Sequence, residues 1–153
     1  MTTRIRRCLY IGLGGTGMTA LLHTKRAFID TYGEVPPMVG FLGVDSDSAA
    51  YTKELHSSHG DPVTLTPNEQ FQMGVSGQPI NYYRVSNERF AWLDPRCVGA
   101  LEGLKNLGCG QIRSNGRFVF TLNHDALSNK VMQMINDITN ANIANNPKYA
   151  LLS

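Results

Sequence analysis

Two short apolar runs flank an amphipathic stretch in the first third of the chain. Residues 5–11 and 38–44 are mostly apolar and end at glycine or acidic residues, which is typical of strands buried on both faces. Between them, residues 15–31 carry apolar side chains near helical spacing, with the aliphatic stem of Lys25 at the edge of the stripe. Strand, helix and strand in this order predict an α/β fold with a mostly parallel sheet.

The middle of the chain has a weaker pattern. Residues 48–55 predict a short helix, and residues 63–65 predict a third, short strand. Prolines and glycines interrupt residues 66–100, which therefore predict loops and short helices. The residues expected to anchor a core beneath this irregular region are Phe90, Trp92 and Leu93.

The last third of the chain predicts a long helix over residues 115–140 and a fourth strand over residues 149–153. Ligands bind at the carboxyl ends of parallel strands, so an α/β domain rarely ends on one. We therefore expect residues 1–153 to form a single, truncated domain. The residues expected on the buried side of the long helix are Phe118, Leu122, Val131, Ile135 and Ile138.

Composition narrows the class of protein. The 153 residues are 42% hydrophobic and 17% charged, which is ordinary for a globular domain. A net charge of +2 gives no argument for nucleic acid as a partner. No apolar stretch is long enough to span a membrane. The three scattered cysteines lack the spacing of a zinc site, so we expect free thiols and a cytoplasmic location.

A glycine-rich segment joins the first predicted strand to the first predicted helix. Its sequence, Gly12-Leu13-Gly14-Gly15-Thr16-Gly17, matches the G-x-G-x-x-G pattern. Glycines let the backbone approach a phosphate, the helix start offers free N–H groups, and Thr16 adds a hydroxyl donor. The alternative is a glycine-rich turn that packs the strand against the helix.

Two acidic residues, Asp45 and Asp47, follow the second predicted strand. In a dinucleotide-binding fold one acid at this position binds ribose hydroxyls. A pair of carboxylates also suits a hydrated Mg²⁺ beside phosphates. The alternative is that one of them caps the following helix.

A second glycine-rich segment, Gly108-Cys109-Gly110-Gln111, precedes the long helix. Because the start of the following helix offers free N–H groups, this segment predicts a second loop in contact with phosphate. The alternative is a turn that connects two helices.

These three segments, in this order, resemble the nucleotide-binding half of the tubulin/FtsZ superfamily, and most closely its bacterial tubulin-like branch. The phrases that carry the resemblance are residues 11–17, residues 41–47 and residues 108–117. The resemblance implies a Rossmann-like three-layer fold, GTP or GDP with Mg²⁺ as cofactors, and self-association into protofilaments. The complete protein would be a GTPase.

The resemblance also assigns roles to individual residues. Residues Gly12 to Gly17 would contact the α- and β-phosphates, and Asp45 and Asp47 would lie near Mg²⁺. Gly108, Cys109, Gly110 and Gln111 would form the loop near the γ-phosphate. The family's fourth glycine-rich loop would begin where this sequence stops, at Ser153, and the catalytic acidic loop comes later still. We therefore expect this chain to bind nucleotide weakly and to hydrolyse none.

Two other function classes remain open. An NAD(P)-binding oxidoreductase domain explains Gly12–Gly17 and Asp45 equally well, but it explains neither Asp47 nor the second glycine segment. In a non-catalytic assembly module, the glycine segments would be purely structural.

Overall fold

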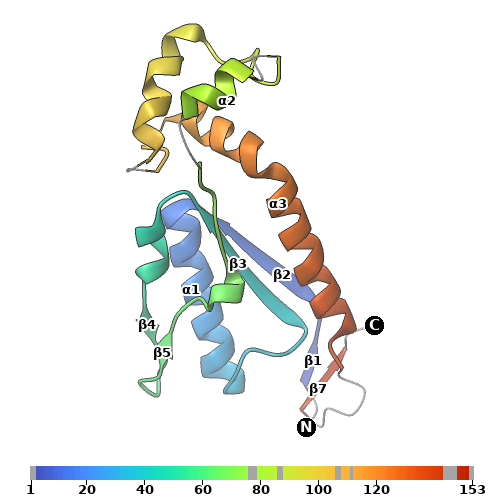
Figure 1. Cartoon of the computed structure of the whole chain (residues 1–153). Coiled ribbons are helices and arrows are strands. Elements are labelled where there is room, and N and C mark those ends of the chain that lie inside the picture. The colour runs from blue at the N-terminus through green and yellow to red at the C-terminus, as the bar shows by residue number, and fades with distance from the viewer. Residues whose placement is uncertain are drawn as a thin grey trace.

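The structure is a computed structural model, and it describes residues 3–75, 79–85, 88–105, 108–110, 112–142 and 148–151. Figure 1 shows a small sheet with one long helix on each side and a helical lobe at one end of the second helix. The elements, in chain order, are β1 (Thr3–Ile5), β2 (Cys8–Leu13), α1 (Gly14–Tyr32), β3 (Val39–Asp45), η1 (Ser48–Thr52), β4 (Leu55–His56), β5 (Pro62–Val63), η2 (Pro67–Glu69), β6 (Gln70–Gln72), α2 (Pro79–Val85), η3 (Pro95–Lys105), α3 (Arg113–Asn140) and β7 (Tyr149–Leu151).

The central sheet is parallel and has the order β2-β3-β6. The predicted first strand, residues 5–11, is divided in two: β1 ends at Ile5 and β2 begins at Cys8. β2 pairs with β3, whereas β1 pairs in parallel with β7. At the break, the Arg7 guanidinium donates to the Ile138 carbonyl in the last turn of α3. Cations are favourable at that end of a helix.

The two faces of the sheet are covered by different helices. Side chains along β3 alternate: Phe41 packs in the cluster beneath α1, and Leu42 packs with Met134 of α3. Gly43 allows α1 to approach the sheet closely, since a Cβ at this position would lie 2.3 Å from the Met18 sulfur. Helix, parallel sheet and helix form the three layers that the sequence predicted.

The third strand of the central sheet differs from the prediction. Residues 63–65 do not join this sheet: β5 forms a two-stranded antiparallel hairpin with β4. The third strand is β6, which pairs in parallel with β3 beside the acidic turn. The sequence of β6, Gln-Phe-Gln, is short and polar, so it gives no strand signal.

Both predicted long helices are present, and the short one is shorter than expected. α1 ends at Gly33, whose left-handed φ of 79° lets its N–H donate to the Ile29 carbonyl. The helix predicted over residues 48–55 is a single 3₁₀ turn, η1. No helix in the described ranges is both long enough and apolar enough to cross a bilayer.

Along α3 the predicted buried face is only partly correct, because Leu122 and Val131 are half-buried. Phe118 and Ile138 are buried, but Ile135 is 41% exposed, and the unpredicted Met134 takes its place in the core. In Figure 1 the C-terminal part of α3 lies against the sheet, while its N-terminal part extends beyond it. A single helical stripe therefore cannot be buried along the whole helix.

The helical lobe packs on the N-terminal part of α3. The rings of Phe90 and Phe118 are tilted by 38° to each other with centroids 4.6 Å apart, and Leu93 is buried in the same cluster. Trp92 is half-buried, with the Arg117 guanidinium 4.1 Å from its ring centroid. The predicted core beneath the irregular region is confirmed.

Lys25 differs from its expected place at the edge of an apolar stripe. It is 7% exposed, and its ammonium donates to Glu69 Oε2 at 2.6 Å and to the Thr64 carbonyl at 2.9 Å. The same Glu69 oxygen accepts the Thr66 N–H at 2.7 Å. This ion pair fastens the middle of α1 to the segment that leads into β6.

Replacing Lys25 with methionine tests this ion pair. Lys25→Met keeps the apolar stem but leaves the Glu69 carboxylate nearly buried without its cation, so we expect a loss of about 2–3 kcal/mol in the free energy of unfolding. Urea denaturation measures it. The matched control is Arg26→Met, which removes a more exposed pair with Asp30 and should cost less than about 1 kcal/mol. Equal losses in the two variants would contradict the role of Lys25.

Candidate functional site

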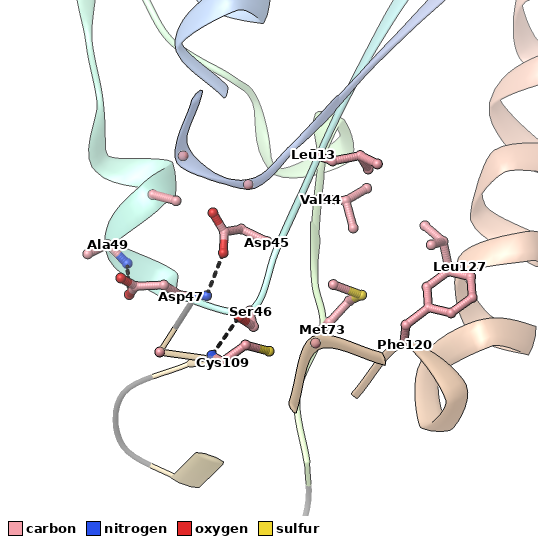
Figure 2. Close-up of a pocket in the computed structure, with 15 residues that line it drawn as sticks. Leu13, Val44, Asp45, Ser46, Asp47, Ala49, Met73, Cys109, Phe120 and Leu127 are labelled. Atoms are coloured by element: carbon pink, nitrogen blue, oxygen red, sulfur yellow. Dashed lines mark hydrogen bonds between the residues drawn. The ribbon is translucent and has the colours of Figure 1, made fainter. Parts of the chain in front are cut away.

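A cleft of about 710 Å³ opens at the carboxyl ends of the central strands. Ligands of α/β proteins bind at this edge, and the volume is in the range of a small-molecule site. Its walls come from the three turns singled out in the sequence, from η1, from Met73 just after β6 and from α3 (Figure 2). The lining residues are Leu13, Gly14, Gly15, Val44, Asp45, Ser46, Asp47, Ala49, Ala50, Met73, Cys109, Gly110, Gly116, Phe120 and Leu127.

Within the first glycine segment, two glycines have a structural role. β2 runs into α1 without an intervening loop, which brings Gly12 and Gly17 into contact. A Cβ on Gly12 would lie 2.5 Å from the Gly17 carbonyl oxygen, and a Cβ on Gly17 would lie 2.8 Å from the Gly12 carbonyl carbon. Both atoms are backbone, so neither position has room for a larger residue. These two glycines pack the strand against the helix.

The middle of the same segment faces the cleft. Leu13, Gly14 and Gly15 line it, whereas Thr16 is exposed and is not part of the wall described. Gly14 has a φ of 70°, and a Cβ there would meet no atom within 4 Å. Open space beside a left-handed glycine at a helix start is the feature expected of a backbone that a ligand approaches.

The acidic turn is held by a chain of local hydrogen bonds. The Asp47 N–H donates to Asp45 Oδ1 at 3.0 Å, and the Ala49 N–H donates to Asp47 Oδ1 at 2.9 Å. Asp47 is thus the N-cap of η1, as one alternative predicted. In Figure 2 the Asp45 carboxylate lies between this turn and the turn from β2 to α1. These two hydrogen bonds use one oxygen of each carboxylate and leave both acids in the cleft wall.

Tyr51 braces the acidic turn, and sequence reasoning missed it. Its hydroxyl accepts the Asp45 N–H at 2.8 Å and donates to the Phe71 carbonyl of β6 at 2.6 Å. Burial is the main cause that raises the pKa of Tyr51 to about 12, so the hydroxyl keeps its proton at neutral pH. This tyrosine fixes the end of β3 to β6.

The second glycine segment lies directly against the acidic turn. The Cys109 N–H donates to Ser46 Oγ at 3.1 Å (Figure 2). Gly108 and Gly110 have φ values of 60° and 56°, which other residues adopt only at a cost. Gln111 lies outside the described residues. Sequence reasoning assigned Ser46 no role, although it stands between the two acids. Its hydroxyl joins the acidic turn to the second glycine segment.

The cleft has one polar side and one apolar side. The glycine turns and the acids form the polar side, and Figure 2 shows Leu13, Phe120 and Leu127 across from them. No cluster of three or more histidine, cysteine or acidic side chains suited to a metal ion occurs within the described ranges. A Mg²⁺ at Asp45 and Asp47 would therefore need oxygens from a ligand or from water, which is how Mg²⁺ usually binds nucleotide phosphates.

Comparison with known families decides what kind of protein this is. A family model described as tubulin like matches residues 9–151, from β2 to the end of β7. The chain belongs to the tubulin-like family. The resemblance to the tubulin/FtsZ superfamily seen in its three turns is thereby confirmed. Searches of curated proteins and of solved structures give no match.

Two glycine substitutions in this tubulin-like chain distinguish a glycine that packs the strand against the helix from one that leaves open space for a ligand. Gly12→Ala forces a Cβ against the Gly17 backbone, and we expect it to lower the free energy of unfolding by about 3 kcal/mol or more. Gly14→Ala meets no neighbour, so only its left-handed φ should cost about 1–2 kcal/mol. Urea denaturation of both variants measures the difference. Gly14→Ala being the less stable of the two would contradict the division of roles.

Proposed function

We propose that this chain binds a guanine nucleotide with Mg²⁺, with the phosphate chain at the three turns of the cleft. One observation carries the proposal: residues near positions 14, 46 and 109 line one cleft at the carboxyl edge of a parallel sheet. The sequence predicts the two glycine turns as phosphate-contacting elements and the acidic turn as a site for Mg²⁺ beside the phosphates. The choice of guanine rests on membership of the tubulin-like family.

The start of α1 supports an anionic ligand. α1 has 19 residues, so the unpaired N–H groups and the dipole of its first turn favour negative charge. No acidic residue in that first turn offsets them. Gly14, with open space around it, allows a phosphate to approach the backbone closely.

The two acids support a divalent cation beside the phosphates. Asp45 and Asp47 would hold a hydrated Mg²⁺ through the oxygens that the local hydrogen bonds do not use. Without a cation these carboxylates would repel a phosphate chain. The bound cation would supply charge neutralisation of the phosphates. The hydrogen bonds that hold the acidic turn keep the two carboxylates in the cleft wall, which supports this role.

Self-association into protofilaments, with GTP hydrolysis in the complete assembly, belongs to the same proposal. Both are activities that the resemblance to the tubulin/FtsZ superfamily implies. The same cleft is compatible with NAD(P), and a module without a ligand would leave its glycines purely structural. Binding measurements distinguish these three functions.

Titration of the chain with GTP, ATP and NAD, with and without Mg²⁺, tests the proposal. We expect weak binding that favours GTP and strengthens with Mg²⁺. Asp45→Asn combined with Asp47→Asn keeps the Oδ1 acceptors, and asparagine is a good helix cap. With two negative charges removed, this variant should bind GTP as well as or better than wild type without Mg²⁺. It should lose most of the gain that Mg²⁺ gives.

The control removes two exposed acids elsewhere, Asp61→Asn with Asp137→Asn, and should behave as wild type. A preference for NAD would contradict the tubulin-like function. Absence of binding at millimolar nucleotide would favour an assembly module. An equal response to Mg²⁺ in wild type and in the variant with both cleft acids replaced would refute the cation site.

A further inference from the structure

We propose that Lys53 binds the phosphate chain and makes the cleft selective for polyphosphorylated ligands over uncharged ones. The proposal deepens the nucleotide-binding function and rests on it. Lys53 follows η1 directly, as its C-cap residue, and sequence reasoning gave it no role. Three observations carry the inference: its hydrogen bonds, its position on a helix dipole, and the charge of the cleft wall.

The ammonium of Lys53 reaches across to the first turn of α1. Lys53 Nζ donates to the Gly15 carbonyl at 2.9 Å and to Thr19 Oγ1 at 3.0 Å. Gly15 lines the cleft, and a Cβ built on it would lie 3.7 Å from the same Nζ. An ammonium has three donors, so one donor remains beyond these two contacts. Lys53 is exposed, and its flexible stem lets the ammonium turn toward a ligand beside Gly15.

The first turn of α1, to which the ammonium bonds, offers Lys53 no negatively charged partner. The N-terminus of a helix carries partial positive charge, and a lysine there is normally destabilising. Both hydrogen-bond partners of Lys53 are neutral oxygens, and the first turn of α1 contains no acid. A bound phosphate chain would relieve the repulsion between the ammonium and the helix terminus.

The cleft itself has no cation in the part of its wall that the structure describes. Asp45 and Asp47 are its charged lining residues, and the rest of the described lining is neutral. A nucleoside triphosphate carries several negative charges, more than one Mg²⁺ neutralises. Lys53 bonds to a lining residue and so lies near enough to supply the additional positive charge.

η1 connects this cation to the acidic turn. Asp47 caps the start of the 3₁₀ turn, and Lys53 follows its last residue, Thr52. A phosphate chain held by both ends of η1 would contact the Mg²⁺ site through Asp47 and the glycine turn through Lys53. This arrangement favours a ligand with several linked phosphates over one without any.

Isothermal titration of wild type, Lys53→Met and Lys53→Arg with GTP, guanosine and inorganic tripolyphosphate, all with Mg²⁺, tests the inference. Lys53→Met should weaken GTP and tripolyphosphate binding by about tenfold or more, the loss expected for one charge-assisted hydrogen bond. Guanosine binding should be unchanged. Lys53→Arg should restore most of the affinity for both phosphate ligands. The charge-matched control, Arg4→Gln, lies on β1, which pairs with β7 outside the central sheet and away from the cleft, and should have no effect.

The outcomes separate the two proposals. If wild type binds GTP and Lys53→Met matches Arg4→Gln, the role of Lys53 is refuted and the nucleotide site stands. If Lys53→Met weakens guanosine as much as GTP, Lys53 only braces η1 and the selectivity is refuted. If wild type binds neither GTP nor tripolyphosphate, both the proposed function and this inference fail.

Discussion

The hydrogen bonds between β2 and β3 hold the carboxyl ends of two parallel strands level with each other. Their register pairs Gly12 with Gly43 and Leu13 with Val44, the last pair before each chain turns away. The glycine turn and the acidic turn therefore emerge side by side. A shift of this register by one residue would move every side chain of a strand to the opposite face and separate the turns. The cleft exists because this pairing is fixed.

Close backbone contact and a few specific bonds then hold the turns in place. Gly12 and Gly17 bring the start of α1 directly over the end of β2. Tyr51 ties Asp45 to β6, and Ser46 ties the acidic turn to Cys109. The bonds from Tyr51 to Phe71 and from Cys109 to Ser46 join segments far apart in sequence. These contacts fix the relative positions of the three turns that line the cleft.

Apolar patterns were enough to predict the scaffold. The runs that form β2 and β3 are mostly apolar, and α1 and α3 carry apolar side chains near helical spacing. These patterns arise because the buried faces of the four elements pack against one another. β6 could not be predicted, since two of its three side chains are glutamine and only pairing with β3 makes it a strand. The prediction that Ile135 is buried was wrong because α3 extends past the sheet. The spacing of apolar residues within one helix does not reveal where its packing partner ends.

The candidate site was predicted in outline but not in its details. The glycines and acids after the first two strands, and the glycines before the long helix, indicated three turns that the structure brings together in one cleft. The sequence could not separate the packing role of Gly12 from the open position of Gly14, because both fit the same pattern. It also gave no sign of Tyr51 or Lys53. Their roles depend on partners such as Phe71 and Gly15, which only the fold brings near.

The central claim is that three separate turns bind one phosphate chain. Amide chemical shifts of the isotope-labelled chain, recorded as GTP and Mg²⁺ are added, test this claim most directly. If the three turns bind one phosphate chain, the amide signals of Gly14, Gly15, Asp47, Cys109 and Gly110 shift together, with a single apparent affinity. Shifts confined to one turn, or centred on the β4–β5 hairpin away from the cleft, would contradict it.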